Sequence, residues 1–216
     1  MSDASIFEQI TRLGVVPVIA IDSAEAALPL ADALLAGGLP IIEITFRTAA
    51  AAEVIELLCR RRPEIIVGAG TILTTENLEA AGAAGARFGI APGMNPQIVA
   101  RAQEIGLPFV PGVATASDIE CALSMGSTTL KFFPSQALGG VAMLRALAAP
   151  FSHTGLRFVP TGGINPENLE SYLSLPVVAA AGGTWIAKKD DIAAGRWPEI
   201  RDRCKAAVEL VARARR

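Results

Sequence analysis

The strongest constraint on the fold of this chain is a regular alternation of two kinds of segment. Short apolar runs rich in β-branched residues alternate with alanine-rich segments whose apolar residues recur with a helical period. Each strand-like run begins about 20 to 29 residues after the previous one, the size of one strand–helix unit. The eight runs are Val15–Ile21, Ile41–Phe46, Ile65–Gly70, Arg87–Ala91, Pro108–Val113, Thr128–Phe133, Arg157–Thr161 and Val177–Ala181.

Eight strand-like runs, each followed by a helix-like run, predict an α/β fold that closes into a single (β/α)8 TIM barrel. The length of 216 residues fits one barrel domain over residues 1–216, and 51% apolar residues supply its core. An open, doubly wound parallel sheet is the alternative. We expect an extra N-terminal helix at Ser5–Leu13 and a long final helix at Trp197–Arg216. The clearest helices between strands are Ala24–Ala36, Ala49–Arg60, Thr75–Ala84 and Pro96–Ile105.

Charge and apolar patterning limit the possible partners and the compartment. The net charge of −2 argues against a nucleic-acid surface, which needs a basic patch. No apolar run reaches the roughly 18 residues of a membrane span. Residues 1–5 lack the basic start and apolar core of a secretion signal. The three cysteines are scattered and form no CxxC pair. These features predict a cytoplasmic protein with no membrane or nucleic-acid partner.

A single histidine narrows the chemistry further. His153 is the only one in the chain, which excludes histidine-rich zinc sites and leaves serine or cysteine nucleophile systems with one candidate base. It lies in a polar stretch between a helix-like and a strand-like segment, so we expect a surface loop residue. Catalysis must then rely on lysine, carboxylate, arginine and backbone groups.

The second strand-like run carries polar side chains where a barrel needs apolar ones. Successive side chains of a strand point to opposite faces, so Glu43, Thr45 and Arg47 share one face. Ile42 and Ile44 share the other face, which suits packing against helices. An acid, a hydroxyl and a guanidinium are therefore expected to point into the barrel mouth. The alternative is a buried Glu–Arg pair with a structural role.

The sixth run repeats the anomaly with a lysine. Lys131 lies between Leu130 and Phe132, and lysine is almost never fully buried unless it is paired. Burial disfavours the charged ammonium form and makes a neutral amine available, which can attack a ketone and form a Schiff base. The alternatives are a lysine that reaches solvent at the strand end, or one that pairs with Glu43.

Glycines after the last two strands indicate an anion site. The stretches Thr161-Gly162-Gly163 and Gly182-Gly183-Thr184 follow the seventh and eighth runs, where barrels often hold a phosphate on backbone N–H groups. By contrast, Gly68-Ala69-Gly70 does not open a dinucleotide-binding motif. Leu73 stands at the position of that motif's third glycine.

Together these segments resemble a known family, the bacterial 2-keto-3-deoxy-6-phosphogluconate (KDPG) aldolase/4-hydroxy-2-oxoglutarate (KHG) aldolase family. The likeness begins in the first strand-like run and continues nearly to the C-terminus. It implies a class I lyase that cleaves KDPG reversibly to pyruvate and glyceraldehyde 3-phosphate, and 4-hydroxy-2-oxoglutarate to pyruvate and glyoxylate. It also implies a homotrimer of barrels that uses no metal or organic cofactor. The motifs are Glu43–Thr48, Val67–Thr71, Lys131–Pro134, Pro160–Ile164 and Gly182–Trp185.

The resemblance also implies roles for individual residues. Lys131 corresponds to the Schiff-base lysine and Glu43 to the general acid/base. Contacts to the pyruvate carboxylate are implied for Arg47 and Thr71, near the backbone of Pro92-Gly93, and Phe133 would wall the pocket. The implied phosphate cradle, which continues from Thr161, comprises Gly162, Gly163, Gly183 and Thr184.

Two departures from the family pattern bear on substrate choice. Ser135-Gln136 stands where many members have Ala-Glu, and Thr184 stands where many have serine, which keeps the hydroxyl. The alternatives are an aldolase specific for the 6-phosphogalactonate epimer, another phosphate-binding barrel enzyme such as an isomerase, or a non-catalytic protein that binds a phosphorylated ligand.

Overall fold

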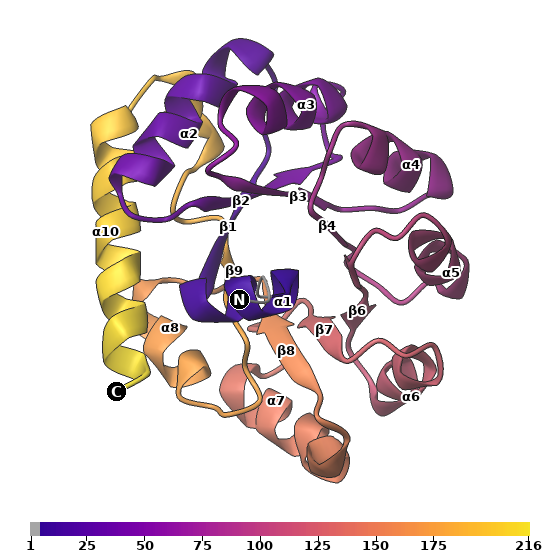
Figure 1. The fold of residues 1–216 in the computed structure, drawn as a ribbon. Coiled ribbons are helices and arrows are strands. Elements are labelled where there is room, and N and C mark those ends of the chain that lie inside the picture. The colour runs from indigo at the N-terminus through magenta and orange to yellow at the C-terminus, as the bar shows by residue number, and fades with distance from the viewer. Residues whose placement is uncertain (1–4) are drawn as a thin grey trace.

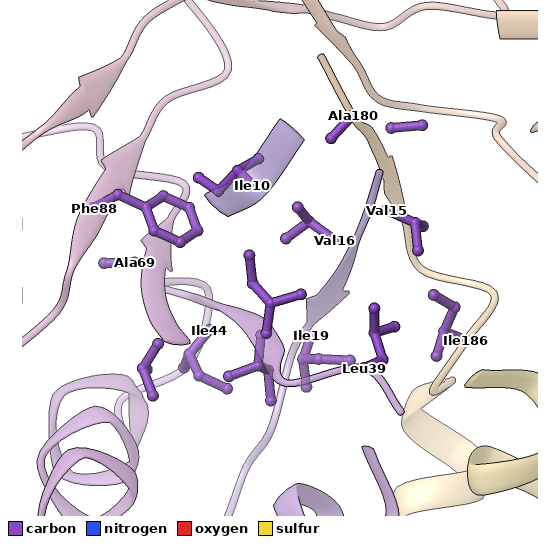
Figure 2. Packing of buried hydrophobic residues seen from close by; sticks show 14 of the residues in the cluster. Ile10, Val15, Val16, Ile19, Leu39, Ile44, Ala69, Phe88, Ala180 and Ile186 are labelled. Carbon is purple, nitrogen blue, oxygen red and sulfur yellow. The ribbon is translucent and has the colours of Figure 1, made fainter. Parts of the chain in front are cut away.

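The computed structural model describes residues 5–216, in which parallel strands form a ring with helices around the outside (Figure 1). Buried side chains of the strands and of the inward-facing sides of the helices form one apolar core. Figure 2 shows part of it, including Val16, Ile19, Ile44 and Phe88. The strands are β1 (Val15–Ile19), β2 (Ile41–Thr45), β3 (Ile66–Gly70), β4 (Phe88–Ile90), β5 (Phe109–Val110), β6 (Gly112–Val113), β7 (Thr129–Phe132), β8 (Arg157–Pro160) and β9 (Ala181–Gly183).

The strands form two hydrogen-bonded groups, and two further connections between these groups close the ring. Six strands pair in parallel in the order β5-β4-β3-β2-β1-β9, and three pair in the order β6-β7-β8. Pro111 separates β5 from β6 because it has no N–H to donate, so the two segments are one interrupted strand. Parallel bridges from Phe158 to Val178 and from Thr161 to Gly182 connect β8 with β9. The predicted closed barrel is therefore confirmed, and the open sheet is excluded.

Helices pack on the outside of the ring, and several begin at a side-chain cap directly after a loop. Thr74, Asn95, Thr115 and Asn165 each accept a hydrogen bond from a backbone N–H in the first turn. The helices are α2 (Ala27–Ala36), α3 (Ala51–Arg61), α4 (Thr75–Ala83), α5 (Pro96–Glu104), α6 (Ala116–Ser124), α7 (Gly140–Ala148), α8 (Pro166–Leu173), α9 (Lys189–Ala193) and α10 (Trp197–Ala214), with 3-10 turns η1 (Ala24–Ala26) and η2 (Ala149–Thr154).

The predicted N-terminal helix is present as α1 (Ile6–Leu13), which immediately precedes β1 and lies across the ring of strands (Figure 1). A reciprocal capping box between Ser5 and Glu8 starts it, and Gly14, with φ of 72°, ends it. Its buried residues are Ile6 and Ile10, and Figure 2 shows Ile10 near side chains of the strands. The helix therefore covers the N-terminal end of the barrel with apolar side chains.

Two local predictions need correction. The eighth strand was expected at Val177–Ala181, but its ladder with β1 runs over Ala181–Gly183, and only Val178 is bridged before it. Two glycines expected in a loop thus lie in the strand. His153 is exposed as expected, yet it belongs to η2 rather than to a loop. None of the helices that the structure describes is long and apolar enough to cross a membrane.

Candidate active site

A cavity of about 200 Å³ lies at the C-terminal ends of the strands. Most of its walls come from residues directly after β2, β3, β4, β7, β8 and β9, the end of a barrel where active sites are built. It brings together nine of the eleven predicted site residues; Glu43 and Gly183 are the other two. The lining residues are Val18, Arg47, Thr71, Pro92, Lys131, Phe133, Thr161, Gly162, Gly163, Ile164, Gly182 and Thr184.

Lys131 and Glu43 meet across the barrel. Lys131 lies in β7 and Glu43 in β2, on opposite sides of the ring, and both side chains point inward, as the alternation along the second strand predicted for Glu43. Lys131 is 4% exposed and Glu43 is 1% exposed. The distance from Lys131 Nζ to Glu43 Oε1 is 3.6 Å. A buried amine and a buried carboxyl group are thus held within reach of one reacting molecule.

Burial and nearby positive charges act in opposite directions on the carboxyl group of Glu43. Burial raises the pKa of Glu43 above its ordinary value, against the opposing effects of Lys131 and, more weakly, Arg47. Oε1 is buried and has no hydrogen-bond partner among the described residues. Gly70 provides the space, because a Cβ there would lie 2.1 Å from Oε1. Lys131 Nζ, 3.6 Å away, is near Oε1 but beyond hydrogen-bond distance. A buried carboxyl oxygen without a hydrogen bond is costly, which points to a role other than stability.

Arg47 is oriented by a short relay of hydrogen bonds. Its Nε donates to Thr45 Oγ1 at 3.1 Å, and this hydroxyl donates to the carbonyl of Ile19 at 2.9 Å. Only Nε is used in this relay, so the two terminal nitrogens remain to bind a carboxylate in the paired geometry that arginine favours. Thr45 therefore acts as a support for Arg47 on the same strand face.

Thr71 has an unusual backbone. Its φ is 57°, in the left-handed region, and it is the one non-glycine residue with positive φ in the described chain. Such a conformation costs on the order of 1–3 kcal/mol for a non-glycine residue and is concentrated at functional sites. Thr71 directly follows β3 and lines the cavity. The strained backbone therefore sets the orientation of Thr71 in the cavity that Lys131 also lines.

The turn after β8 has the geometry of an anion cradle. Gly162 and Gly163 both have positive φ, of 96° and 79°, which glycine adopts without strain. Their N–H groups donate no hydrogen bond within residues 5–216. Thr184, exposed directly after β9, lines the same cavity, and β9 is bridged to the residue before this turn through Gly182 and Thr161. Successive free N–H groups in such a turn are a common way to bind phosphate.

Gly183 and Phe133 lie differently within the site. Gly183, in β9, pairs with Pro17 of β1. A Cβ on Gly183 would lie 2.6 Å from Trp185 Nε1, so the indole of Trp185 occupies the space where a side chain of residue 183 would be. Its neighbour Gly182 lines the cavity instead. The ring of Phe133 forms a wall, with its centroid 5.4 Å from Lys131 Nζ.

The sequence did not single out Val18 and Ile164 as lining residues, and it indicated Gly182 only as part of the glycine stretch after the eighth strand. The first strand is apolar throughout, so no alternation marks Val18 as facing the cavity. Gly182 was assigned to a loop because the eighth strand was placed two to four residues too early. Ile164 directly follows the glycine pair, and its position in the turn was the available signal.

No three histidine, cysteine, aspartate or glutamate side chains gather to hold a metal ion within residues 5–216. The ionisable groups at the cavity are the amine of Lys131, the guanidinium of Arg47 and the adjoining carboxyl group of Glu43. An inward-facing lysine beside an inward-facing carboxyl group, at the C-terminal mouth of a (β/α)8 barrel, defines the class of Schiff-base-forming barrel enzymes. The model of one aldolase family, KDPG and KHG aldolase, matches residues 6–203. The chain belongs to the KDPG and KHG aldolase family.

Individual relatives agree with this assignment. A 2-dehydro-3-deoxy-phosphogluconate aldolase from Treponema pallidum is 44% identical over 207 residues, which cover 96% of this chain and 98% of the relative. A solved KDPG aldolase from Legionella pneumophila, with pyruvate captured as a covalent carbinolamine intermediate, has a TM-score of 0.89. It is 42% identical, and the match covers 93% of this chain and 97% of that one. The Zymomonas mobilis ZM4 enzyme, solved with 3-phosphoglycerate, has a TM-score of 0.86 and 36% identity over 96% and 97% of the chains.

Proposed function

We propose that this protein is a class I aldolase, a lyase that cleaves 2-dehydro-3-deoxy-6-phosphogluconate reversibly to pyruvate and glyceraldehyde 3-phosphate, with Lys131 as the Schiff-base residue. The observation that carries the proposal is the buried pair in the cavity, with Lys131 Nζ 3.6 Å from Glu43 Oε1. A buried amine can add to a ketone only if a neighbouring group removes and returns protons, and Glu43 is the carboxyl group in reach.

The reaction begins with addition. The neutral amine of Lys131 attacks the C2 ketone, and the carbinolamine loses water after Glu43 protonates its hydroxyl. The resulting iminium is an electron sink. Glu43, directly or through a water molecule, then takes the proton of the C4 hydroxyl, and the C3–C4 bond breaks. Its electron pair forms the enamine while glyceraldehyde 3-phosphate departs. Protonation at C3 and hydrolysis of the iminium release pyruvate and restore the amine.

The electrostatics suit a group that alternates between acid and base. General acid–base catalysis works best when the pKa of the group lies near the working pH. Burial raises the pKa of Glu43 in that direction. Lys131 Nζ and Glu43 Oε1 are 3.6 Å apart, so a proton can pass between the two groups, directly or through a substrate atom, without leaving the cavity.

The rest of the cavity matches the two ends of the substrate. Arg47 and Thr71, with the backbone at Pro92, would hold the pyruvate carboxylate, and Phe133 would shield the imine from water. At the other end, the N–H groups of the turn after β8 and the region of Thr184 would hold the phosphate. The complete proposed cradle is Thr161, Gly162, Gly163, Gly183 and Thr184.

A second substrate, 4-hydroxy-2-oxoglutarate, is favoured by the same geometry. It shares the 2-keto acid end that Lys131 and Arg47 would engage, and it lacks the phosphate, so it does not need the glycine turn. The family to which the chain belongs includes aldolases for both substrates. Our proposal also includes one barrel domain over residues 1–216. It further includes a homotrimer, and analytical ultracentrifugation tests this oligomeric state.

Borohydride trapping tests the central proposal. The chain has four lysines, and three of them (Lys188, Lys189 and Lys205) are exposed. An amine in water is almost fully protonated at neutral pH and forms an imine poorly, so the exposed lysines are internal controls. Reduction in the presence of pyruvate should attach a three-carbon adduct to Lys131 alone, as located by peptide mass spectrometry. An adduct on an exposed lysine only, or none, would overturn the mechanism, as would trapping that survives Lys131→Ala.

A further inference from the structure

We infer that Tyr172 is a positioning residue for phosphate binding: its buried hydroxyl fixes the turn of Gly162 and Gly163 through Ser135 and Gln136. The inference rests on the proposed function, because it assumes that this turn receives the phosphate of the substrate. Tyr172 does not line the cavity, and it lies in α8, 37 residues from Ser135 in the chain. Its effect on the substrate must therefore pass through other residues.

The hydroxyl of Tyr172 is the centre of a three-group hydrogen-bond chain. Ser135 Oγ donates to Tyr172 OH at 3.0 Å, and Tyr172 OH donates to Gln136 Oε1 at 2.9 Å. Ser135 and Tyr172 are both fully buried, at 0% exposure. A buried hydroxyl is costly unless it is hydrogen-bonded, so Ser135 and Tyr172 hold each other in one arrangement, while Gln136, which is exposed, accepts the hydrogen bond of Tyr172.

The segment that Tyr172 holds is bonded directly to the turn. The N–H of Ser135 donates to the carbonyl of Thr161 at 2.8 Å, and the N–H of Gln136 donates to the carbonyl of Gly162 at 2.9 Å. Gly163 also packs closely on Gln136, because a Cβ on Gly163 would lie 2.5 Å from Gln136 Cβ. The loop after β7 thus holds the backbone of the loop after β8 in place through these hydrogen bonds and this packing.

Fixed carbonyls mean fixed N–H groups. Each peptide unit is planar, so holding the carbonyl of Thr161 sets the direction of the N–H of Gly162, and holding that of Gly162 sets the N–H of Gly163. Both residues have positive φ, and glycines in a turn have wide conformational freedom unless their surroundings restrict it. The hydrogen bonds of Tyr172 therefore preorganise the N–H groups of Gly162 and Gly163, which would otherwise have to be ordered when the phosphate binds.

The variant Tyr172→Phe isolates this effect, because phenylalanine retains the buried ring and removes only the hydroxyl. Without it, Ser135 and Gln136 lose their common partner, and the turn gains freedom. We expect KM for 2-dehydro-3-deoxy-6-phosphogluconate to rise roughly 2- to 12-fold, the range that corresponds to one hydrogen bond. KM for 4-hydroxy-2-oxoglutarate and borohydride trapping of pyruvate should stay unchanged, because neither uses the turn.

The experiment compares kcat and KM on both substrates for the wild type, Tyr172→Phe, Ser135→Ala and the double variant. Ser174→Ala is the matched control, since Ser174 ends the same helix and its hydroxyl donates to the carbonyl of Ser171, outside the hydrogen bonds of Tyr172. If the hydrogen bonds of Ser135 and Tyr172 act as a unit, KM for the phosphorylated substrate should rise no more in the double variant than in the more affected single variant. Ser135→Ala carries the test alone if Tyr172→Phe does not fold.

The outcomes separate this inference from the function on which it rests. A wild type that does not prefer the phosphorylated substrate would overturn the proposed phosphate cradle and this inference with it. A wild type that does prefer it, with variants that change both substrates equally or neither, would overturn the inference alone and leave a structural role for Tyr172. Support requires a selective rise in KM for the phosphorylated substrate that Ser174→Ala does not reproduce.

Discussion

Replacing Glu43 with glutamine should separate proton transfer from binding. Glutamine has nearly the shape of glutamate and fits the space that Gly70 leaves open, but it cannot carry a proton at neutral pH. General acid–base catalysis contributes roughly 10²- to 10⁴-fold, which is about 2.7 to 5.4 kcal/mol at 1.36 kcal/mol per tenfold. The ionisable residues that line the cavity are Arg47 and Lys131, so no second carboxyl group or histidine stands ready to replace Glu43. We therefore expect a loss of about 10³-fold or more.

Two measurements report on the proton shuttle directly. One is kcat for cleavage, followed through the release of pyruvate, and the other is exchange of the pyruvate methyl protons with solvent, followed by NMR. Both should fall together in Glu43→Gln, while pyruvate binding should fall much less because Arg47 and Thr71 hold the carboxylate. Glu43→Asp is the control, since it keeps a proton carrier and should retain more activity than Glu43→Gln. If Glu43→Gln retains full methyl-proton exchange, another group moves the protons and Glu43 is only a partner of Lys131.

Three further results are expected. Gly162→Ala and Thr184→Val should lower kcat/KM for the phosphorylated substrate far more than for 4-hydroxy-2-oxoglutarate; equal losses would make these positions structural. Activity should survive exhaustive chelation, and a loss that a divalent ion restores would place the enzyme in the metal-dependent class. Hydrogen bonds from Arg203 and Arg196 lower the pKa of Asp191 against the opposing effect of burial. Urea unfolding of Asp191→Asn should therefore show a loss of about 2 kcal/mol at pH 7 that shrinks as pH falls below 3.8, the ordinary value, because the contribution is complete only above it.

Much of the barrel follows from the sequence because the same signal is repeated eight times. Each strand–helix unit is weak evidence alone, but errors in single boundaries do not change the number of units or their order. The eighth strand is the one whose bounds the sequence pattern placed wrongly. Val177–Ala181 has the composition of a strand, and glycine normally weakens one, so the glycines that follow were read as a loop. In the structure Gly182 and Gly183 pair with β1 as part of β9, and Thr161 and Trp185 approach them so closely that a Cβ would not fit.

The site was predictable where chemistry conflicts with burial. A glutamate and a lysine inside apolar strands are visible in the sequence, and period-two alternation places both in the barrel interior. The strained φ of Thr71 leaves no comparable trace, because threonine at a strand end predicts nothing about a left-handed backbone. The contact of Ser135 with Tyr172 joins the loop after β7 to helix α8, 37 residues further along the chain, and no local pattern encodes such a contact.

The costs in this structure are concentrated at one end of the barrel, and that distribution itself argues for function. Toward α1 the interior is closed by apolar side chains such as Ile6 and Ile10, which obey the ordinary rules of a core. Toward the cavity the chain buries Glu43 with an oxygen that has no hydrogen-bond partner, buries Lys131 beside it, and holds Thr71 in an unfavourable backbone conformation. Natural sequences keep local rules and packing in agreement except where activity requires otherwise. Three such exceptions around one cavity are difficult to explain by stability, whereas a reaction that needs a buried amine, a proton carrier and a fixed carboxylate accounts for all of them.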